Sequence, residues 1–81
     1  MKILKFYASW CGPCKVQTEI LEKLEGVEIQ NVDIELDEND DLVAEYKVRS
    51  VPKLVILDNE DNKVKEFVGL TQLDTIKEFL K

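Results

Sequence analysis

The chain has 81 residues, with 17 acidic and 11 basic side chains and a net charge of −6. This length predicts one domain over residues 1–81 with a modest core, and the acidic balance argues against binding to the phosphates of nucleic acids. The two cysteines, without any histidine, exclude a cysteine–histidine catalytic pair and fall short of the four ligands of a usual structural zinc site.

Neither a run of about 18 apolar residues nor a secretory leader pattern is visible, so the cytoplasm is the expected compartment. Because the cytoplasm keeps thiols reduced, two closely spaced cysteines there indicate redox chemistry rather than a structural disulfide framework. No metal site is expected.

The first part of the chain predicts a strand followed by a helix. Residues 3–7 form a short, nearly continuous apolar run, interrupted by Lys5, that is typical of a strand buried on both faces of a sheet. Residues 11–24 predict a helix. Pro13 suits its first turn, because proline lacks an N–H and an N–H in that turn would have no partner within the helix. Its expected apolar stripe comprises Val16, Ile20 and Leu24.

The middle of the chain predicts a second strand and a short helix. Gly26 is expected to end the preceding helix, and alternating apolar residues over 27–34 predict the strand. Residues 40–47 predict the short helix, with acidic side chains at its positive N-terminal end. Its expected inward-facing residues are Leu42, Val43 and Tyr46.

The last part of the chain predicts a hairpin and a closing helix. The apolar run 54–57 is the clearest strand, and the polar turn 59–62 returns the chain into an edge strand over 64–68. Thr71 is expected to cap the final helix, with Asp74 in the position of a capping box. The expected apolar stripe of that helix comprises Leu73, Ile76 and Leu80.

The predicted element order is therefore β-α-β-α-β-β-α. A helix joins the first two strands, so they are expected to run parallel with a right-handed crossover, whereas the last two strands form an antiparallel hairpin. We expect an α/β fold with a four-stranded mixed sheet and helices on both faces.

Both cysteines lie in the segment Trp10-Cys11-Gly12-Pro13-Cys14, where the first strand gives way to the helix. Two cysteines separated by two residues can open and close a disulfide without moving the rest of the fold. Cys11 lies at the helix start, where unpaired N–H groups and the helix dipole favour a thiolate, and it is the expected attacking residue. Cys14, one turn later and deeper, would then attack Cys11 and close the ring. The alternatives are two core cysteines at a chance spacing or half of a metal site.

Several segments together resemble the thioredoxin family over nearly the whole chain. They are Phe6-Tyr7-Ala8 followed by Trp10 to Cys14, Arg49-Ser50-Val51-Pro52 before an apolar strand, Val68-Gly69 before the last helix, and Asp37-Glu38-Asn39 through Tyr46. The resemblance implies a thioredoxin fold with strand order 2-1-3-4, reduction of protein disulfides, and re-reduction by a thioredoxin reductase or similar electron donor. We expect no cofactor beyond the redox-active disulfide, no nucleic-acid or membrane partner, and a monomer.

By position, the resemblance makes Cys11 the attacking and Cys14 the resolving cysteine, and it makes Pro52 a cis-proline that faces them. An ordinary core position is the alternative for Trp10, but a tryptophan beside a reactive loop favours contact with a partner. The expected substrate-binding residues are Trp10, Gly12, Pro13, Val51, Pro52, Gly69 and Leu70.

Two departures from the family pattern concern length and charge. The chain lacks the N-terminal strand and helix of full-length thioredoxins and is closer in size to glutaredoxins and miniature thioredoxins. The family has a buried aspartate where this chain has Lys5, and often a lysine where it has Asp33. Both lie on strands predicted to be neighbours, so we expect a reversed ion pair beneath the disulfide.

The proton on Cys14 could be managed by either member of this pair. Asp33 could accept it, or Lys5 could act as the base or stabilise the thiolate. The alternative is that Lys5 extends to the end of the sheet and Asp33 lies in water.

Two other functions compete with protein-disulfide reduction. A glutaredoxin-like reductase using glutathione fits the short chain, but Gly12-Pro13 and the single matching glycine, Gly69, favour the thioredoxin-like interpretation. The second alternative is a non-catalytic binding subunit that uses the same apolar rim.

Overall fold

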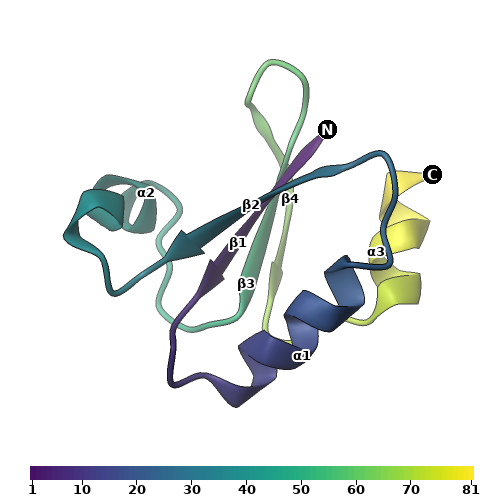
Figure 1. Cartoon of the computed structure of the whole chain (residues 1–81). Helices are drawn as coiled ribbons and strands as arrows, with labels where there is room; N and C mark the ends of the chain where they lie inside the picture. The colour runs from purple at the N-terminus through teal and green to yellow at the C-terminus, as the bar shows by residue number, and fades with distance from the viewer.

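Strands and helices alternate along the chain in the computed structural model, which describes residues 1–81 (Figure 1). The elements are β1 (Lys2–Tyr7), α1 (Gly12–Leu21), β2 (Glu28–Asp33), the 3-10 turn η1 (Asp37–Asn39), α2 (Asp40–Glu45), β3 (Lys53–Leu57), β4 (Lys63–Val68) and α3 (Leu73–Leu80). Every predicted strand and helix is present, in the predicted order. None of the helices is long and apolar enough to cross a membrane.

The strands form one sheet in the order β2-β1-β3-β4, as predicted. β1 pairs in parallel with β2, and antiparallel pairs join β1 to β3 and β3 to β4. β1 therefore has a neighbouring strand on each side, which explains its nearly unbroken apolar run. Its C-terminal end, at Tyr7, leads through a short loop into α1 (Figure 1).

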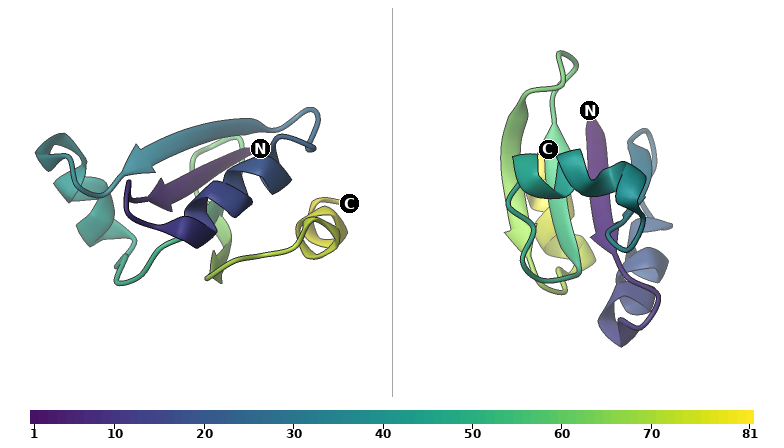
Figure 2. Two further views of the ribbon diagram at one scale, coloured as in Figure 1. Left: turned by 60° about the horizontal axis from the view of Figure 1, so that its bottom comes forward. Right: turned by 90° about the vertical axis from the view of Figure 1, so that its left-hand side faces the viewer.

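Side chains alternate between the two faces of the sheet, and each face has its own helices (Figure 2). The face covered by α1 and α3 has a buried core of Ile3, Leu21, Leu54, Ile56 and Ile76. The opposite face has a buried core of Leu4, Phe6, Val32, Val55 and Leu57. The residues of α2 and its end that pack on this second core are Leu42, Val43 and Tyr46. The predicted helices on both faces are confirmed, as is the inward face of α2.

α1 is shorter than predicted, because it ends at Leu21 rather than Leu24. It also turns a different face toward the core than the predicted apolar stripe. Val16, expected to be buried, is 44% exposed. Each residue turns the helix by about 100°, so Val16 lies on the side opposite Cys14. The predicted stripe is therefore wrong at Val16, because burial of the cysteine pair sets the rotation of the helix. The residues of α1 that are buried are Cys14, Gln17 and Leu21.

The predicted helix cap at Thr71 is wrong. The N-cap residue of α3 is Gln72, which makes no side-chain cap bond, so the capping box with Asp74 is not formed. Thr71 is buried, and its hydroxyl donates to the Gly69 carbonyl over 3.0 Å. The backbone N–H and carbonyl of Thr71 form hydrogen bonds with the Gln17 side chain of α1, and these bonds hold Thr71 outside α3.

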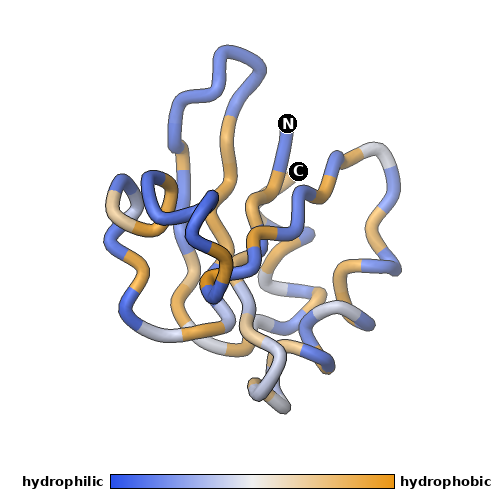
Figure 3. Tube along the Cα trace, turned by 60° about the vertical axis from the view of Figure 1, so that its left-hand side comes forward, coloured by the Kyte–Doolittle hydropathy of each residue, from blue (hydrophilic) through white to orange (hydrophobic).

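A polar turn joins β3 to β4 and projects from the sheet as a hydrophilic loop (Figure 3). The Asp58 carboxylate accepts the N–H groups of Asn62 and Glu60, at 2.9 and 2.8 Å, and these bonds lower the pKa of Asp58. β4 follows as the edge strand that the sequence predicts, with Lys63 and Lys65 exposed.

A buried charge that the sequence analysis missed lies at Lys53, the first residue of β3. Its Nζ donates to the Tyr46 carbonyl at the end of α2 over 2.6 Å and pairs with Glu66 of β4 over 2.7 Å. Bonds from Lys53 and Lys63 lower the pKa of Glu66 to about 2. Lys53 therefore links α2 to the two strands that follow the proline loop.

Candidate active site

The two cysteines lie where β1 ends and α1 begins, and they form a disulfide with 5.3 Å between their Cα atoms. Cys11 is the N-cap residue of α1, and its Sγ accepts the Cys14 N–H over 3.1 Å. The first N–H groups of a helix have no partner within the helix, so the sulfur takes the place of the usual capping oxygen. When the disulfide opens, the same N–H and the helix dipole favour a thiolate at Cys11.

Both cysteines are nearly enclosed, with 4% of Cys11 and 3% of Cys14 exposed. They form a small apolar cluster with Ala8, against which Ile34 and Val51 pack. The two exposed fractions are almost equal, so residue exposure gives no support to the prediction that Cys14 lies deeper. The distinction between the two cysteines rests instead on Cys11 being the helix cap.

The proline loop faces the disulfide, as the resemblance implies. The Val51–Pro52 peptide bond is cis, and Val51 packs against the cysteine cluster. Pro52 is buried, and its carbonyl accepts the Gly69 N–H over 2.9 Å. This bond joins the proline loop to the turn between β4 and α3. Gly69 has a φ of +87°, a conformation that residues with a Cβ rarely adopt.

The predicted substrate-binding residues divide into supporting and exposed ones. Val51, Pro52 and Gly69 form the connected backbone support described above. Trp10 is 69% exposed directly before Cys11, and Leu70 is exposed directly after Gly69, so both side chains are free to contact a partner. The remaining two, Gly12 and Pro13, are exposed in the first turn of α1.

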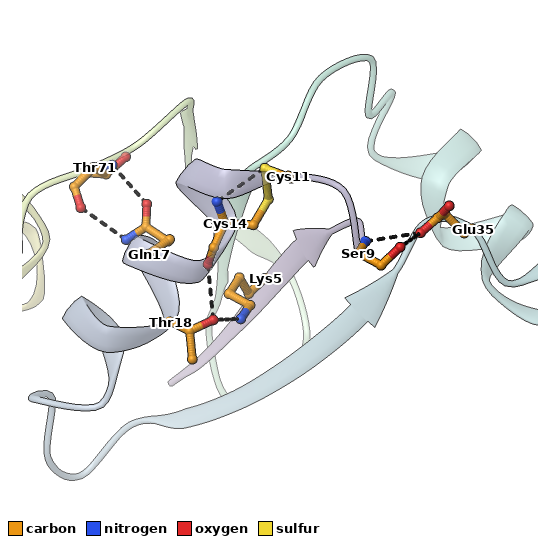
Figure 4. Close-up of a disulfide and its surroundings, with 8 residues drawn as sticks. All are labelled: Lys5, Ser9, Cys11, Cys14, Gln17, Thr18, Glu35 and Thr71. Atoms are coloured by element: carbon orange, nitrogen blue, oxygen red, sulfur yellow. Dashed lines mark hydrogen bonds between the residues drawn. A yellow bond between two sulfur atoms is a disulfide. The ribbon is translucent and has the colours of Figure 1, made fainter.

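A carboxylate that the sequence analysis missed holds the loop before Trp10. The N–H and the hydroxyl of Ser9 both donate to Glu35, over 3.0 and 2.8 Å (Figure 4). These two bonds, the N–H first, lower the pKa of Glu35, and the Trp10 side chain adds to the effect. Glu35 follows β2, so it fixes the active-site loop to the neighbouring strand end.

Lys5 lies beneath the helical turn that carries Cys14 (Figure 4). It is buried, its Nζ donates to the Thr18 hydroxyl, and that hydroxyl donates to the Cys14 carbonyl over 3.1 Å. The ammonium also lies 5.1 Å from the centre of the Tyr7 ring. Burial lowers the pKa of Lys5, while the charge of Glu22 partly opposes that shift.

The predicted ion pair between Lys5 and Asp33 is wrong. In the parallel register Lys5 lies opposite Asn31, and Asp33 lies opposite Tyr7. Two residues along a strand correspond to about 7 Å, and the Asp33 carboxylate instead accepts the N–H of Glu35 over 2.9 Å. The two strands are neighbours as predicted, but their register keeps the two charged residues apart.

A hollow of about 190 Å³ opens beside the disulfide and is lined by Lys5, Tyr7, Cys14 and Thr18, among others. This volume exceeds the space that a water molecule requires, so water can reach the region between Lys5 and Cys14. No three His, Cys, Asp or Glu side chains are grouped so as to hold a metal ion.

Gln17 is the other site residue that the sequence analysis missed. Its fully buried amide forms two hydrogen bonds with the backbone of Thr71, 54 residues later in the chain (Figure 4). The available signal was a polar side chain three residues after Cys14, on the face of the helix that the cysteine occupies.

Comparison with known proteins explains this arrangement. The family model for thioredoxin matches residues 1–81. The chain belongs to the thioredoxin family. Over 83 residues it is 35% identical to the thioredoxin of Staphylococcus epidermidis, a match that covers 99% of this chain and 79% of that protein. It is 37% identical over 82 residues to the mitochondrial thioredoxin of Mus musculus, with 98% of this chain and 49% of that protein covered.

The solved structures give the same family assignment. A mutant thioredoxin from Halobacterium salinarum superposes with a TM-score of 0.79 at 36% identity, covering 96% of this chain and 69% of that one. The predicted thioredoxin fold and family are therefore confirmed. The chain spans about half the length of the mitochondrial thioredoxins that it matches.

Proposed function

We propose that this chain is a thiol–disulfide oxidoreductase that reduces protein disulfides through Cys11 and Cys14. The observation that carries the proposal is a disulfide whose first cysteine caps α1 and packs against Val51 of the cis-proline loop. Membership of the thioredoxin family supports the same activity. The chain would act as one domain, and the disulfide would be its only redox group.

The reaction proceeds by two exchanges. The Cys11 thiolate attacks one sulfur of a substrate disulfide, the substrate S–S bond breaks, and a mixed disulfide forms as the first substrate thiolate leaves. The Cys14 thiolate then attacks Cys11, the mixed bond breaks, and the second substrate thiolate leaves. Two electrons pass to the substrate, whose two thiolates take up the two protons lost by the cysteines. The chain ends in the disulfide state observed here.

We propose that Lys5 stabilises the thiolate form of Cys14 and that Asp33 has no role in the reaction. The Lys5 ammonium is buried, reaches the turn of Cys14 through Thr18, and shares a hollow with the cysteine. A cation close to a thiol lowers the thiol pKa because it stabilises the charged form. Asp33 is engaged with the backbone of Glu35.

A substrate would contact the exposed side chains of Trp10 and Leu70. The exposed residues Gly12 and Pro13 would also be accessible to it. The substrate-binding residues that support this surface are Val51, Pro52 and Gly69. The proposed partners are proteins with accessible disulfides and a thioredoxin reductase or similar donor. We further propose that the chain acts in the cytoplasm as a monomer.

The test is reduction of insulin disulfides, with electrons supplied by NADPH and a thioredoxin reductase or, in parallel, by glutathione. Turnover with the reductase is expected to exceed turnover with glutathione, and turnover with neither would overturn the proposal. Cys11→Ser should abolish turnover. Cys14→Ser should trap a mixed disulfide with insulin, detectable by mass spectrometry, because the resolving thiol is missing. A double serine variant with full biological activity would instead indicate a binding subunit.

A further inference from the structure

Gln17 is a fully buried polar side chain that bridges two elements of the fold. Both hydrogen bonds of its amide go to one residue: Nε2 donates to the Thr71 carbonyl over 3.0 Å, and Oε1 accepts the Thr71 N–H over 2.8 Å. A buried polar group is costly unless it is paired, and here both partners are backbone groups that would otherwise be unpaired. The geometry joins α1 to the turn before α3 in one fixed position.

The contact belongs to a connected series of bonds around the disulfide. The Thr71 hydroxyl donates to the Gly69 carbonyl, the Gly69 N–H donates to the Pro52 carbonyl, and Val51 packs against the cysteines. Gln17 lies one helical turn beyond Cys14, on the same buried face of α1. The series therefore runs from the cysteine helix through the β4–α3 turn to the proline loop and back to the cysteines.

We infer that Gln17 is a positioning residue for protein substrates. It sets the distance between the helix that carries the cysteines and the turn that carries Leu70, and this spacing decides how an extended substrate segment fits across the disulfide. The inference rests on the proposed reduction of protein disulfides and adds a determinant of substrate class to it.

Substrate size separates this role from a role in the sulfur chemistry. Trp10 and Leu70 are exposed on separate loops, so a protein segment lying over the disulfide can contact both, whereas a small disulfide needs access to Cys11 alone. Loss of the Gln17 contact should thus weaken reduction of proteins and spare reduction of small disulfides. A misplacement of reacting groups by about 1 Å can cost as much as a hundredfold in rate, so an effect of about tenfold is expected for a shifted rim.

Two substitutions test the contact. Gln17→Met keeps the length and most of the volume of the side chain but removes both hydrogen bonds. Gln17→Glu keeps the acceptor for the Thr71 N–H, but only its protonated form can donate to the Thr71 carbonyl. Glu19→Gln, at an exposed position of the same helix, is the matched control.

The readout is the ratio of kcat/KM for insulin to the rate constant for an aromatic disulfide reagent such as dithionitrobenzoate. We expect the ratio to fall about tenfold in Gln17→Met through a raised KM for insulin, with Glu19→Gln unchanged. In Gln17→Glu the ratio should fall as pH rises, while it stays constant in the wild type. Dividing the two rates removes the shared dependence on the Cys11 thiolate.

Two results would overturn the inference. One is an unchanged ratio in Gln17→Met, and the other is an equal loss of both rates, which would place the effect on the cysteines themselves. If Gln17→Met does not fold, Gln17→Glu decides the question through its pH dependence. A wild-type chain that reduces neither substrate would defeat the proposed function, whereas one that reduces both with an unaltered ratio in the variants defeats this inference alone.

Discussion

Replacing Lys5 with methionine removes the one buried positive charge beneath the turn of Cys14 while keeping the length of the side chain. Lys5 reaches that turn through two successive hydrogen bonds, by way of Thr18. The two bonds together span about 6 Å and end at the Cys14 carbonyl, so we take roughly 7 Å as the separation of ammonium and sulfur for an order-of-magnitude estimate. At an effective dielectric constant of about 20, the attraction between ammonium and thiolate is then about 2 kcal/mol.

The adjoining hollow is open to solvent, which screens that attraction, so we expect an effect of about 1.4 kcal/mol. This energy is equivalent to about one unit in the pKa of the Cys14 thiol. The thiolate belongs to the reduced protein, so a cation that stabilises it makes the disulfide easier to reduce. Lys5→Met should therefore raise the thiol pKa by about one unit and lower the reduction potential by about 30 mV.

The assay is equilibration with glutathione redox buffers at a series of pH values, with the oxidised fraction read from the tryptophan fluorescence. The difference between wild type and Lys5→Met should be present above the thiol pKa and disappear below it, where both forms carry neutral thiols. Lys23→Met, which removes an exposed charge beyond the end of α1, is the control and should leave the potential unchanged. Identical potentials for wild type and Lys5→Met across the whole pH range would refute the reasoning.

Three further predictions concern stability and loop order. The pKa of Glu66 is about 2 in the folded chain, below its usual 4.5, so its contribution to stability is complete above pH 4.5 and is lost as pH falls toward 2. Its side chain is 37% exposed, so Glu66→Gln should remove only about 1 kcal/mol of that pH-dependent stability, measured by urea unfolding at each pH. Leu21→Ala should cost about 2–5 kcal/mol and Val16→Ala less than about 0.5 kcal/mol, and equal costs would contradict the observed rotation of α1. Glu35→Ala should speed amide hydrogen exchange at Ser9 in NMR spectra, because that N–H loses its acceptor; unchanged protection would show that the loop is held by other contacts.

The helices and strands of this fold can be predicted from the sequence because the patterns that indicate them lie within single short segments. The unbroken apolar run of β1, the polar turn after β3 and the paired cysteines at a strand-to-helix junction each fix one step of the chain. The glycine after β4 is required by a positive φ, which is also a property of a single residue. Strand order then followed from the connections and from the resemblance to thioredoxins.

The failures have a different cause, which is that register, tertiary hydrogen bonds and packing decide them rather than the local pattern of residues. The sequence predicts the correct strands for Lys5 and Asp33, but the parallel register puts Tyr7 opposite Asp33. The cap predicted at Thr71 was displaced by a bond to Gln17, and neither residue carries a local sign of the other. Periodicity gives the spacing of a helical stripe, whereas tertiary packing chooses which stripe is buried.

Because Cys11 is the helix cap, the first turn of α1 can keep its structure throughout each catalytic cycle. The sulfur that exchanges partners is the same atom that accepts the Cys14 N–H. That bond can persist in the disulfide, the mixed disulfide and the thiolate, so α1 needs no rearrangement of its first turn as the sulfur changes state. A charged acceptor makes the stronger bond, so α1 is held most firmly when the nucleophile is formed. Reactivity and local rigidity therefore rise together in this site.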